Sequence, residues 1–272
     1  LNWQGSAQAI TKYQAKGRVL QFEMASRAAP STPAQVSVPV GTPGVAGLTL
    51  DFDLNQAGGQ AELLLQDGAV DLPGVFEDPL VRVGQLSGQV KWQVDGERIA
   101  VQLPNLKFSN ADAQGEAQIK WETADPLRSG AHARFPGVLD LQASLSRADG
   151  TKVHRYLPLV IPASARHYVR DAIVSAVATG ARFKVKGDLH DMPFKDPRQG
   201  EFRISANIQN ATFAYVPRSL QPADSLPWPA LTNMSGELVV ERARLQVNQA
   251  RAQLGARAAL QVSKAQGLIA SL

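Results

Sequence analysis

The residues of this chain that could most readily do chemistry are four histidines: His132, His154, His167 and His190. A neutral imidazole nitrogen is a common metal ligand, and ligand pairs usually recur at short spacings such as HxH or HxxxH. The four histidines lie 22, 13 and 23 residues apart, so no such pair occurs. Only folding could assemble a metal site from them. We expect none, and interpret each as a solvated or turn histidine.

The densest polar cluster consists of Asp188, His190 and Asp191, directly before Met192 and Pro193. Carboxylates beside an imidazole could act in general acid–base catalysis. Aspartate and proline in close succession are also typical of turns. We interpret the cluster as a turn that ends a strand.

No other group of residues predicts an enzyme. Asp51 and Asp53 project from the same side of one expected strand, and paired carboxylates need a cleft to hydrolyse a glycoside, so we expect both to be solvated. The sequence has neither a glycine-rich phosphate loop before a helix nor a GxSxG elbow. It has no cysteine, which excludes disulfides, thiolate ligands and thiol nucleophiles. We therefore predict a non-enzymatic protein with no catalytic residue, metal or cofactor.

The composition is that of a folded, slightly basic protein. Of 272 residues, 44% are hydrophobic and 19% are charged, and the net charge is +4. The cations are scattered, and the densest group, Arg182, Lys184 and Lys186, alternates with Phe183 and Val185, as on the wet face of a strand. A basic chain could bind nucleic acid or anionic lipid. We predict no nucleic-acid partner, because no continuous basic groove or known motif is present.

The start of the sequence predicts a segment of a longer protein. The chain opens at residues 1–3 (LNW) in strand-like sequence, without an initiator Met or a charged and apolar signal segment. No stretch approaches the roughly 18 apolar residues that a membrane-spanning helix needs. We expect any anchor or signal to lie outside this chain. The absence of cysteine is compatible with the periplasm.

Alternation of apolar and polar residues with a period of two dominates the sequence. Residues 48–54 (LTLDFDL) place every leucine and phenylalanine on one face and every acid or hydroxyl on the other. Successive side chains of a strand point to opposite faces, so such segments predict half-buried antiparallel strands. The same alternation occurs in 90–94, 139–145, 183–189 and 202–208, and glycine-containing turns separate the segments.

Two segments interrupt the strands. Residues 29–45 contain four prolines and little periodicity, so they predict a connecting loop. Around 163–179, apolar residues recur at helical spacing and predict one amphipathic helix, with Ser164 as its N-cap and Gly180 just after its end. This helix could pack on an edge or end of a sheet, or it could plug or gate a groove.

An internal repeat suggests how the strands are organised. Residues 86–90 (LSGQV) recur as 234–238 (MSGEL), the next strands also correspond, and a third match pairs 113–117 with 253–257. Such repetition is typical of stacked copies of one supersecondary unit. We therefore predict the end of a preceding β-repeat (1–28), a Pro-rich connecting loop (29–45), a first β-groove repeat (46–160), the helix and its connection (161–180) and a second β-groove repeat (181–272).

The middle of the chain resembles the central region of the YhdP branch of the AsmA-like proteins. The resemblance covers about residues 46 to 262, and the order and spacing of its short motifs carry it. Two positions depart from the family pattern, Tyr168-Val169 in the helix and Met192 before Pro-Phe, and both keep an apolar residue. The motifs are 71–79 (DLPGVFEDP), 86–92 (LSGQVKW), 110–113 (NADA), 136–141 (PGVLDL), 156–158 (YLP), 161–162 (IP) with the helix after it, 187–189 (GDL), 193–194 (PF), 200–202 (GEF), 215–217 (YVP) and 228–229 (WP).

The resemblance implies an inner-membrane-anchored, mostly periplasmic protein of Gram-negative bacteria that serves outer-membrane biogenesis. Its relatives are thought to form long curved β-sheets with an apolar channel that moves phospholipid between the inner and outer membranes. For this chain it implies a mostly β fold, with an open groove formed by a long, curved antiparallel sheet. Phospholipid acyl chains would be the partner, and both membranes would be reached through parts of the protein outside this chain.

A sheet with one apolar face must hide that face. A second sheet could cover it, giving an ordinary sandwich, or the sheet could curve into a groove that acyl chains fill. The rival function is a non-enzymatic scaffolding β-module in outer-membrane assembly. For the groove we predict a wall formed by Leu48, Leu50, Phe52, Val90, Trp92, Ile99, Val101, Phe183, Val185, Phe202, Ile204 and Leu238.

Overall fold

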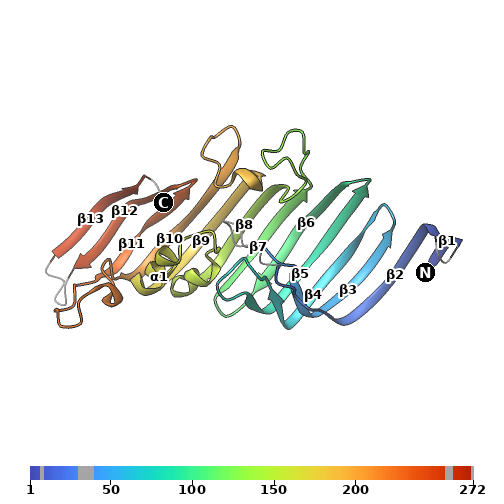
Figure 1. Cartoon of the computed structure of the whole chain (residues 1–272). Helices are drawn as coiled ribbons and strands as arrows, with labels where there is room; N and C mark the ends of the chain where they lie inside the picture. Colours follow the sequence, from blue (N-terminus) through green and yellow to red (C-terminus); the bar gives the residue numbers. More distant parts are fainter. Residues whose placement is uncertain (7–8, 30–39, 255–259, 271–272) are drawn as a thin grey trace.

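The chain folds into one long antiparallel sheet, as the computed structural model in Figure 1 shows. The structure describes residues 1–6, 9–29, 40–254 and 260–270. Within them each strand pairs with the strands before and after it in the sequence, and the first and last strands do not meet. The predicted mostly β fold with a curved, open antiparallel sheet is confirmed. The strands are β1 (Asn2–Ser6), β2 (Ala9–Met24), β3 (Gly44–Asn55), β4 (Gly58–Asp71), β5 (Leu80–Asp95), β6 (Arg98–Ser109), β7 (Ala113–Glu122), β8 (Val138–Asp149), β9 (Ile173–Asp188), β10 (Gly200–Phe213), β11 (Leu231–Glu241), β12 (Arg244–Leu254) and β13 (Leu260–Ile269).

One α-helix lies among the described residues, and it is shorter than predicted. It ends at Ala172 because β9 begins at Ile173. Residues 173–179 (IVSAVAT) are rich in β-branched side chains, which favour a strand once neighbouring strands are available. The predicted caps were wrong: Pro162 is the N-cap residue and makes no side-chain cap, and Gly180 lies inside β9. The helical elements are η1 (Gly150–Tyr156), α1 (Ala163–Ala172), η2 (Leu189–Asp191) and η3 (Arg218–Leu220).

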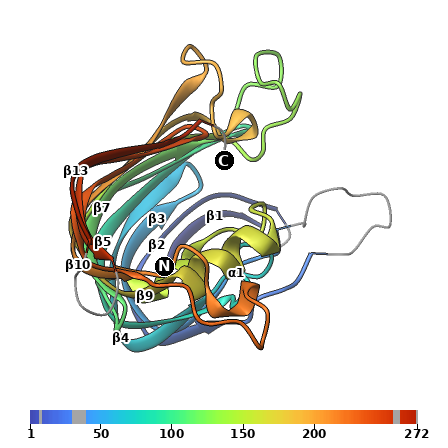
Figure 2. The same cartoon turned by 90° about the vertical axis from the view of Figure 1, so that its left-hand side faces the viewer.

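The strand ends form two long edges. The connections β2–β3, β4–β5, β6–β7, β8–β9, β10–β11 and β12–β13 leave one edge, named here the helix edge because the β8–β9 connection carries η1 and α1. The other edge, the turn edge, includes two-residue turns at 56–57, 96–97 and 242–243. Figure 2 shows the sheet bent into an open C, with α1 on its concave side.

Backbone irregularities in successive strands bend the sheet. The register shifts where residues adopt positive φ angles: Gly180 (61°) in β9, Asn210 (50°) in β10, Asn233 (49°) in β11 and Gln249 (50°) in β12. A β-bulge bends its strand and increases the local twist. Glycine and asparagine reach this left-handed conformation more readily than most residues. The bulges therefore follow one another across the sheet and curve these strands together.

Small side chains occupy the tightest part of the bend. Ala178, Ala181 and Ala206 are 9%, 4% and 9% exposed, and Leu145 and Ile208 pack against them. Side chains converge on the inside of a bend, so packing there leaves little room beyond a methyl group. Alanine at these positions lets the strands curve.

We expect Ala181→Leu to lower the free energy of unfolding by about 1–3 kcal/mol, because the added carbons overpack the bend. The control is Arg182→Leu, at the next position, where the side chain is exposed on the opposite face. That replacement should change stability by less than about 0.5 kcal/mol. Urea unfolding followed by circular dichroism measures both. A loss for Ala181→Leu no larger than that of its control would mean that the bend has spare room.

The matches of the internal repeat fall on corresponding strands only in part. Residues 86–90 lie in β5 and 234–238 in β11, so this pair is equivalent in the meander. The third match is not equivalent, because Ala113 opens β7 whereas Gln253 lies near the end of β12. Residues 255–257 of that match and most of the predicted proline-rich loop lie outside the described residues. The structure contains no helix, in the part described, of the length and apolarity needed to cross a bilayer.

Candidate functional site

Cross-strand pairing joins apolar residues of one face into continuous rows. The longest, named the tryptophan row, runs from β2 to β10 without a polar side chain. Neighbouring strands lie roughly 4.8 Å apart, so its eight steps measure about 38 Å. That exceeds the roughly 30 Å hydrocarbon core of a whole bilayer, and so the row is longer than one lipid. Its members are Ala15, Leu54, Gly59, Trp92, Val101, Trp121, Leu139, Gly187 and Gly200.

Three further rows lie beside it on the same face, and none of their members is charged or polar. The Leu48 row runs from β2 to β9 and consists of Phe22, Leu48, Leu65, Leu86, Phe108, Gly115, Leu145 and Ala181. The Phe202 row consists of Leu103, Ile119, Leu141, Val185 and Phe202. The Phe183 row consists of Ala117, Ala143, Phe183, Ile204, Val240, Leu245 and Ile269.

The apolar face is the concave face of the C. Phe194, in the β9–β10 connection, is fully buried over Gly187 and Gly200 of the tryptophan row, where an added Cβ would come within 2.8 and 2.7 Å of its ring. At the helix edge, the Tyr168 ring of α1 meets the Phe213 ring of β10 with 6.4 Å between centroids. Figure 2 shows α1 on the concave side and the β9–β10 connection rising from the upper lip of the C. All described strands belong to a single sheet, so no second sheet among them covers the apolar face.

The structure places all twelve predicted wall residues on this concave face. Val185 is buried, with 8% exposure, and the other eleven are half-buried. Seven belong to the named rows: Leu48, Trp92, Val101, Phe183, Val185, Phe202 and Ile204. The other five lie on the same face beside the rows: Leu50, Phe52, Val90, Ile99 and Leu238.

The prediction omitted the residues that join its two groups of strands. Ile119 and Trp121 of β7 pair with Leu141 and Leu139 of β8, and they connect the wall of β3–β6 with that of β9–β11. The alternation of Ile119 and Trp121 about Lys120 was a sufficient signal to find them.

The convex face is polar and carries mixed charges. One of its rows, from β2 to β10, consists of Lys16, Asp53, Gln60, Lys91, Gln102, Lys120, Asp140, Lys186 and Glu201. Ion pairs join Lys186 to Asp140 at 3.6 Å and Lys184 to Glu201 at 2.8 Å. A shallow depression of about 590 Å³ also opens on this face, and its charged lining residues are four cations and two acids: Lys107, Arg182, Lys184, Arg203, Glu116 and Glu237. Its charges are mixed and solvated, so it is a poor recognition site for a single ligand.

The residues singled out for chemistry lie apart. No group of three or more potential metal-ligating side chains occurs in the residues that the structure describes. Asp188 accepts the His190 amide at 3.0 Å and caps η2, which confirms the strand-ending turn. Asp51 pairs with Arg18 at 2.9 Å on the convex face, where its side chain is 45% exposed. Asp188 and Asp191 line a shallow depression of about 810 Å³ at the turn edge, and Asp51 lies outside it.

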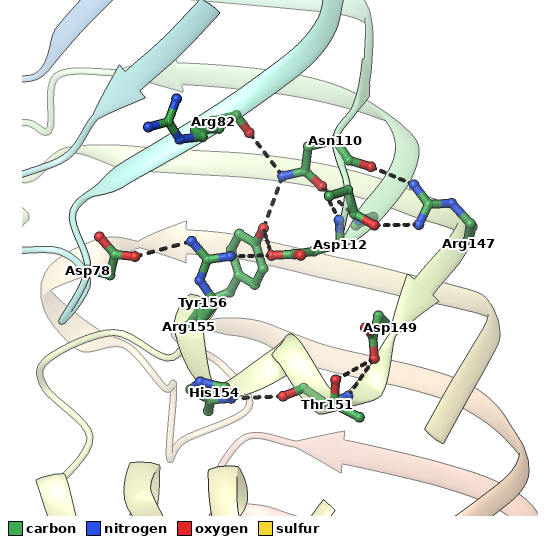
Figure 3. Close-up of polar contacts among 12 residues, drawn as sticks. Asp78, Arg82, Asn110, Asp112, Arg147, Asp149, Thr151, His154, Arg155 and Tyr156 are labelled. Carbon is green, nitrogen blue, oxygen red and sulfur yellow. Dashed lines mark hydrogen bonds and ion pairs between the residues drawn. The ribbon is translucent and has the colours of Figure 1, made fainter. Parts of the chain in front are cut away.

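A polar network fixes the helix edge (Figure 3). Asp112, 7% exposed, accepts hydrogen bonds from Arg155 Nη1 at 2.8 Å and from the Tyr156 hydroxyl at 2.9 Å. Asn110 donates from Nδ2 to Tyr156 and to the Arg82 carbonyl. Burial raises the pKa of the Tyr156 hydroxyl, so it remains a donor at neutral pH. The network therefore ties η1 to the β6–β7 turn and to β5.

A second set of contacts holds α1. Glu77, in the β4–β5 connection, accepts hydrogen bonds from His167 and Arg166, both at 3.2 Å, and these lower the pKa of its carboxyl. Arg170 and Ser219 likewise lower the pKa of Asp171 from 3.8 to about 2. A depressed carboxyl pKa stabilises the fold above the unfolded-state pKa and loses that effect as pH falls through the folded-state pKa. Both contacts are therefore complete at neutral pH.

The concave surface is long and uncharged. At its edges, polar residues form hydrogen bonds and ion pairs with one another. Such a surface can bind hydrocarbon by excluding water, and the described part of it presents no group suited to proton transfer or nucleophilic attack. A family model described as "YhdP protein" matches residues 1–270 of the chain. No curated protein and no solved structure matches it.

Proposed function

The chain belongs to the YhdP family, and from this premise we propose that its concave face holds phospholipid acyl chains and conducts them between the inner and outer membranes. The observation that carries the proposal is the set of continuous apolar rows. They cross as many as nine strands without a charge, and no second sheet covers them in the described residues.

Hydrocarbon would be held by burial and would still be free to slide. Each methylene group moved out of water contributes about 0.8 kcal/mol, so a long acyl chain is retained strongly. Within a row, one apolar contact replaces another as the chain advances, and no single deep cavity has to be left. Movement along the groove therefore requires no catalytic residue, metal or cofactor, and the protein acts without being an enzyme.

The polar parts of the lipid would remain in water at the open side of the C. The convex face keeps its charges in water, and some of them form ion pairs, as Lys184 with Glu201 and Arg203 with Glu241. Such a face suits a segment that stands in the aqueous periplasm. Contact with both membranes would come through other parts of the protein, and nucleic acid has no role in this function.

The direct test is the lipid content of the purified protein. Extraction and mass spectrometry should recover phospholipid. A photoreactive amino acid at Phe52 or Phe202, on the concave face, should form lipid adducts, whereas one at Asp53 or Arg203, on the convex face, should form none. Protein without bound phospholipid, and with no adduct at the two concave positions, would contradict conduction.

The alternative is a scaffolding β-module that assists outer-membrane assembly through protein contacts alone. It is compatible with the same sheet, because a mixed-charge convex face could bind other proteins. Scaffolding predicts crosslinks to protein from convex positions and no lipid adduct from concave ones, so the same experiment separates the two functions.

A further inference from the structure

Two long inserts leave opposite edges of the sheet at neighbouring strands. Most described connections at the turn edge are two-residue turns, but the β7–β8 and β9–β10 connections are long. Residues 123–137 and 189–199 are named here the turn-edge insert, and residues 150–172, which contain η1 and α1, the helix-edge insert. Figures 1 and 2 show them at β7–β10, rising from opposite lips of the C.

The turn-edge insert packs against the tryptophan row. The Trp121 ring stacks on Phe135 with 6.0 Å between centroids, and its indole nitrogen donates to the Pro136 carbonyl at 2.9 Å. The two loops of the insert also join each other, because the Leu189 amide donates to the Gly137 carbonyl at 2.9 Å. The insert is therefore a built structure that continues the apolar face beyond the strand ends.

Hydrogen bonds and packing contacts also hold the helix-edge insert in place. The Leu159 amide donates to the Val75 carbonyl at 2.9 Å, and the rings of Phe76 and Tyr156 meet edge to face at 6.1 Å. Gly150 lies so close to Ala176 on β9 that an added Cβ would come within 2.5 Å of it. The insert thus rests on the concave side of β9 and on the neighbouring connection.

Both inserts expose large apolar side chains. Leu127 and Phe135 of the turn-edge insert are 92% and 55% exposed, and Val160 of the helix-edge insert is 79% exposed. Apolar side chains exposed on loops that are held in place can contact an apolar partner. Phe135 is continuous with the tryptophan row through its contact with Trp121, so the same partner can touch both.

Three arginines of the inserts are already engaged within the protein. Arg134 donates to the Glu97 carbonyl at 2.8 Å, Arg155 is bound by two carboxylates, and buried Arg166 is bound to Glu77. A guanidinium already engaged by a carboxylate or carbonyl is a weaker phosphate ligand than a free one. These three guanidinium groups are therefore weak phosphate ligands, and other cations of the inserts, such as Lys152 and Lys195, are exposed to water.

We propose that the two inserts form a clamp on acyl chains at β7–β10, with Leu127 and Phe135 contacting hydrocarbon at the turn edge and Val160 at the helix edge. This rests on the proposed function and adds a site to it. Elsewhere only the wall contacts an acyl chain, whereas at the clamp the inserts add apolar contacts at both edges. Burial scales with the apolar area removed from water, so lipid should dwell longest here.

The test compares four photoreactive positions in the protein in its native envelope. Phe135 and Val160 report on the clamp, and Phe202 on the concave wall. Arg128 lies in the turn-edge insert with 89% side-chain exposure and serves as the matched polar control. We expect lipid adducts at Phe135 and Val160 with yields comparable to Phe202, and at least about tenfold above Arg128, the ratio that a 1.4 kcal/mol preference gives.

The outcomes separate this proposal from the function on which it rests. Adducts at Phe202 with only background yield at Phe135 and Val160 would overturn the clamp and leave conduction intact. Adducts at Arg128 equal to those at Phe135 would also overturn it, because they would indicate unspecific contact. No adduct at any position, Phe202 included, would instead overturn the proposed function.

Discussion

Replacing Phe202 with aspartate is expected to reduce the phospholipid bound by the protein at least about tenfold, the effect of 1.4 kcal/mol. Phe202 ends a row that includes Leu141 and Val185, so the new carboxylate would stand in the concave wall. The groove is open to water, so water can hydrate the new carboxylate. The fold should therefore tolerate the substitution. An acyl chain passing that point would have to strip water from the charge, which costs several kcal/mol. Quantitative lipid extraction from wild type and variant measures the effect.

The matched control is Arg203→Asp, one residue away on the convex face. It removes the ion pair with Glu241, which joins the two side chains at 3.1 Å with about half of each exposed. An exposed pair of this kind contributes about 1 kcal/mol or less to stability, and lipid content should not change. Phe202→Leu, which keeps the wall apolar, should retain lipid. Equal losses from Phe202→Asp and Arg203→Asp would contradict the assignment of the two faces to lipid and water.

Which side chains of a strand lie on the concave face was predictable, because the alternation of apolar and polar residues is a local signal. Phe52, Trp92 and Phe202 lie on the concave face as the period-two pattern predicts, and so do the other nine wall residues. The continuity of the wall across the strands was harder to predict from the sequence. It depends on register, which pairs Ile119 with Leu141 across two strands, and register depends on bulges that the alternation does not mark.

The helix and its contacts were predictable only in part, for two physical reasons. Residues 173–179 fit a helical period and a strand equally well, and pairing with β10 decided between them, which is a tertiary effect. The contact between Glu77 and Arg166 joins residues 89 positions apart, so no local pattern could reveal it. The proposed clamp could not be predicted for the same reason, since it requires knowing that long connections leave opposite edges of the sheet at neighbouring strands.

The second large effect is expected at the network that holds the helix edge. Asp112→Ala should lower the free energy of unfolding by about 2–4 kcal/mol, because it leaves the Tyr156 hydroxyl and the Arg155 guanidinium without their buried acceptor. The expected loss of stability depends on the burial of the Asp112 side chain as well as on its charge. Asp78 binds the same guanidinium at 3.1 Å, but its side chain is 57% exposed. Asp78→Ala should therefore cost about 1 kcal/mol or less.

Comparing the variants of the two aspartates shows whether the network holds η1 in place. Urea unfolding gives the stability of each variant, and amide hydrogen exchange across residues 150–156 gives the local effect. With Asp112 gone, η1 loses its tie to the β6–β7 turn, so its amides should exchange faster even under conditions where the sheet stays folded. Unchanged exchange in η1, or equal destabilisation by Asp78→Ala, would mean that the β8–β9 connection is held by its apolar contacts instead. If Asp112 does anchor η1, its loss should also loosen the helix-edge half of the clamp. In that case lipid adducts at Val160 should fall while those at Phe202 persist.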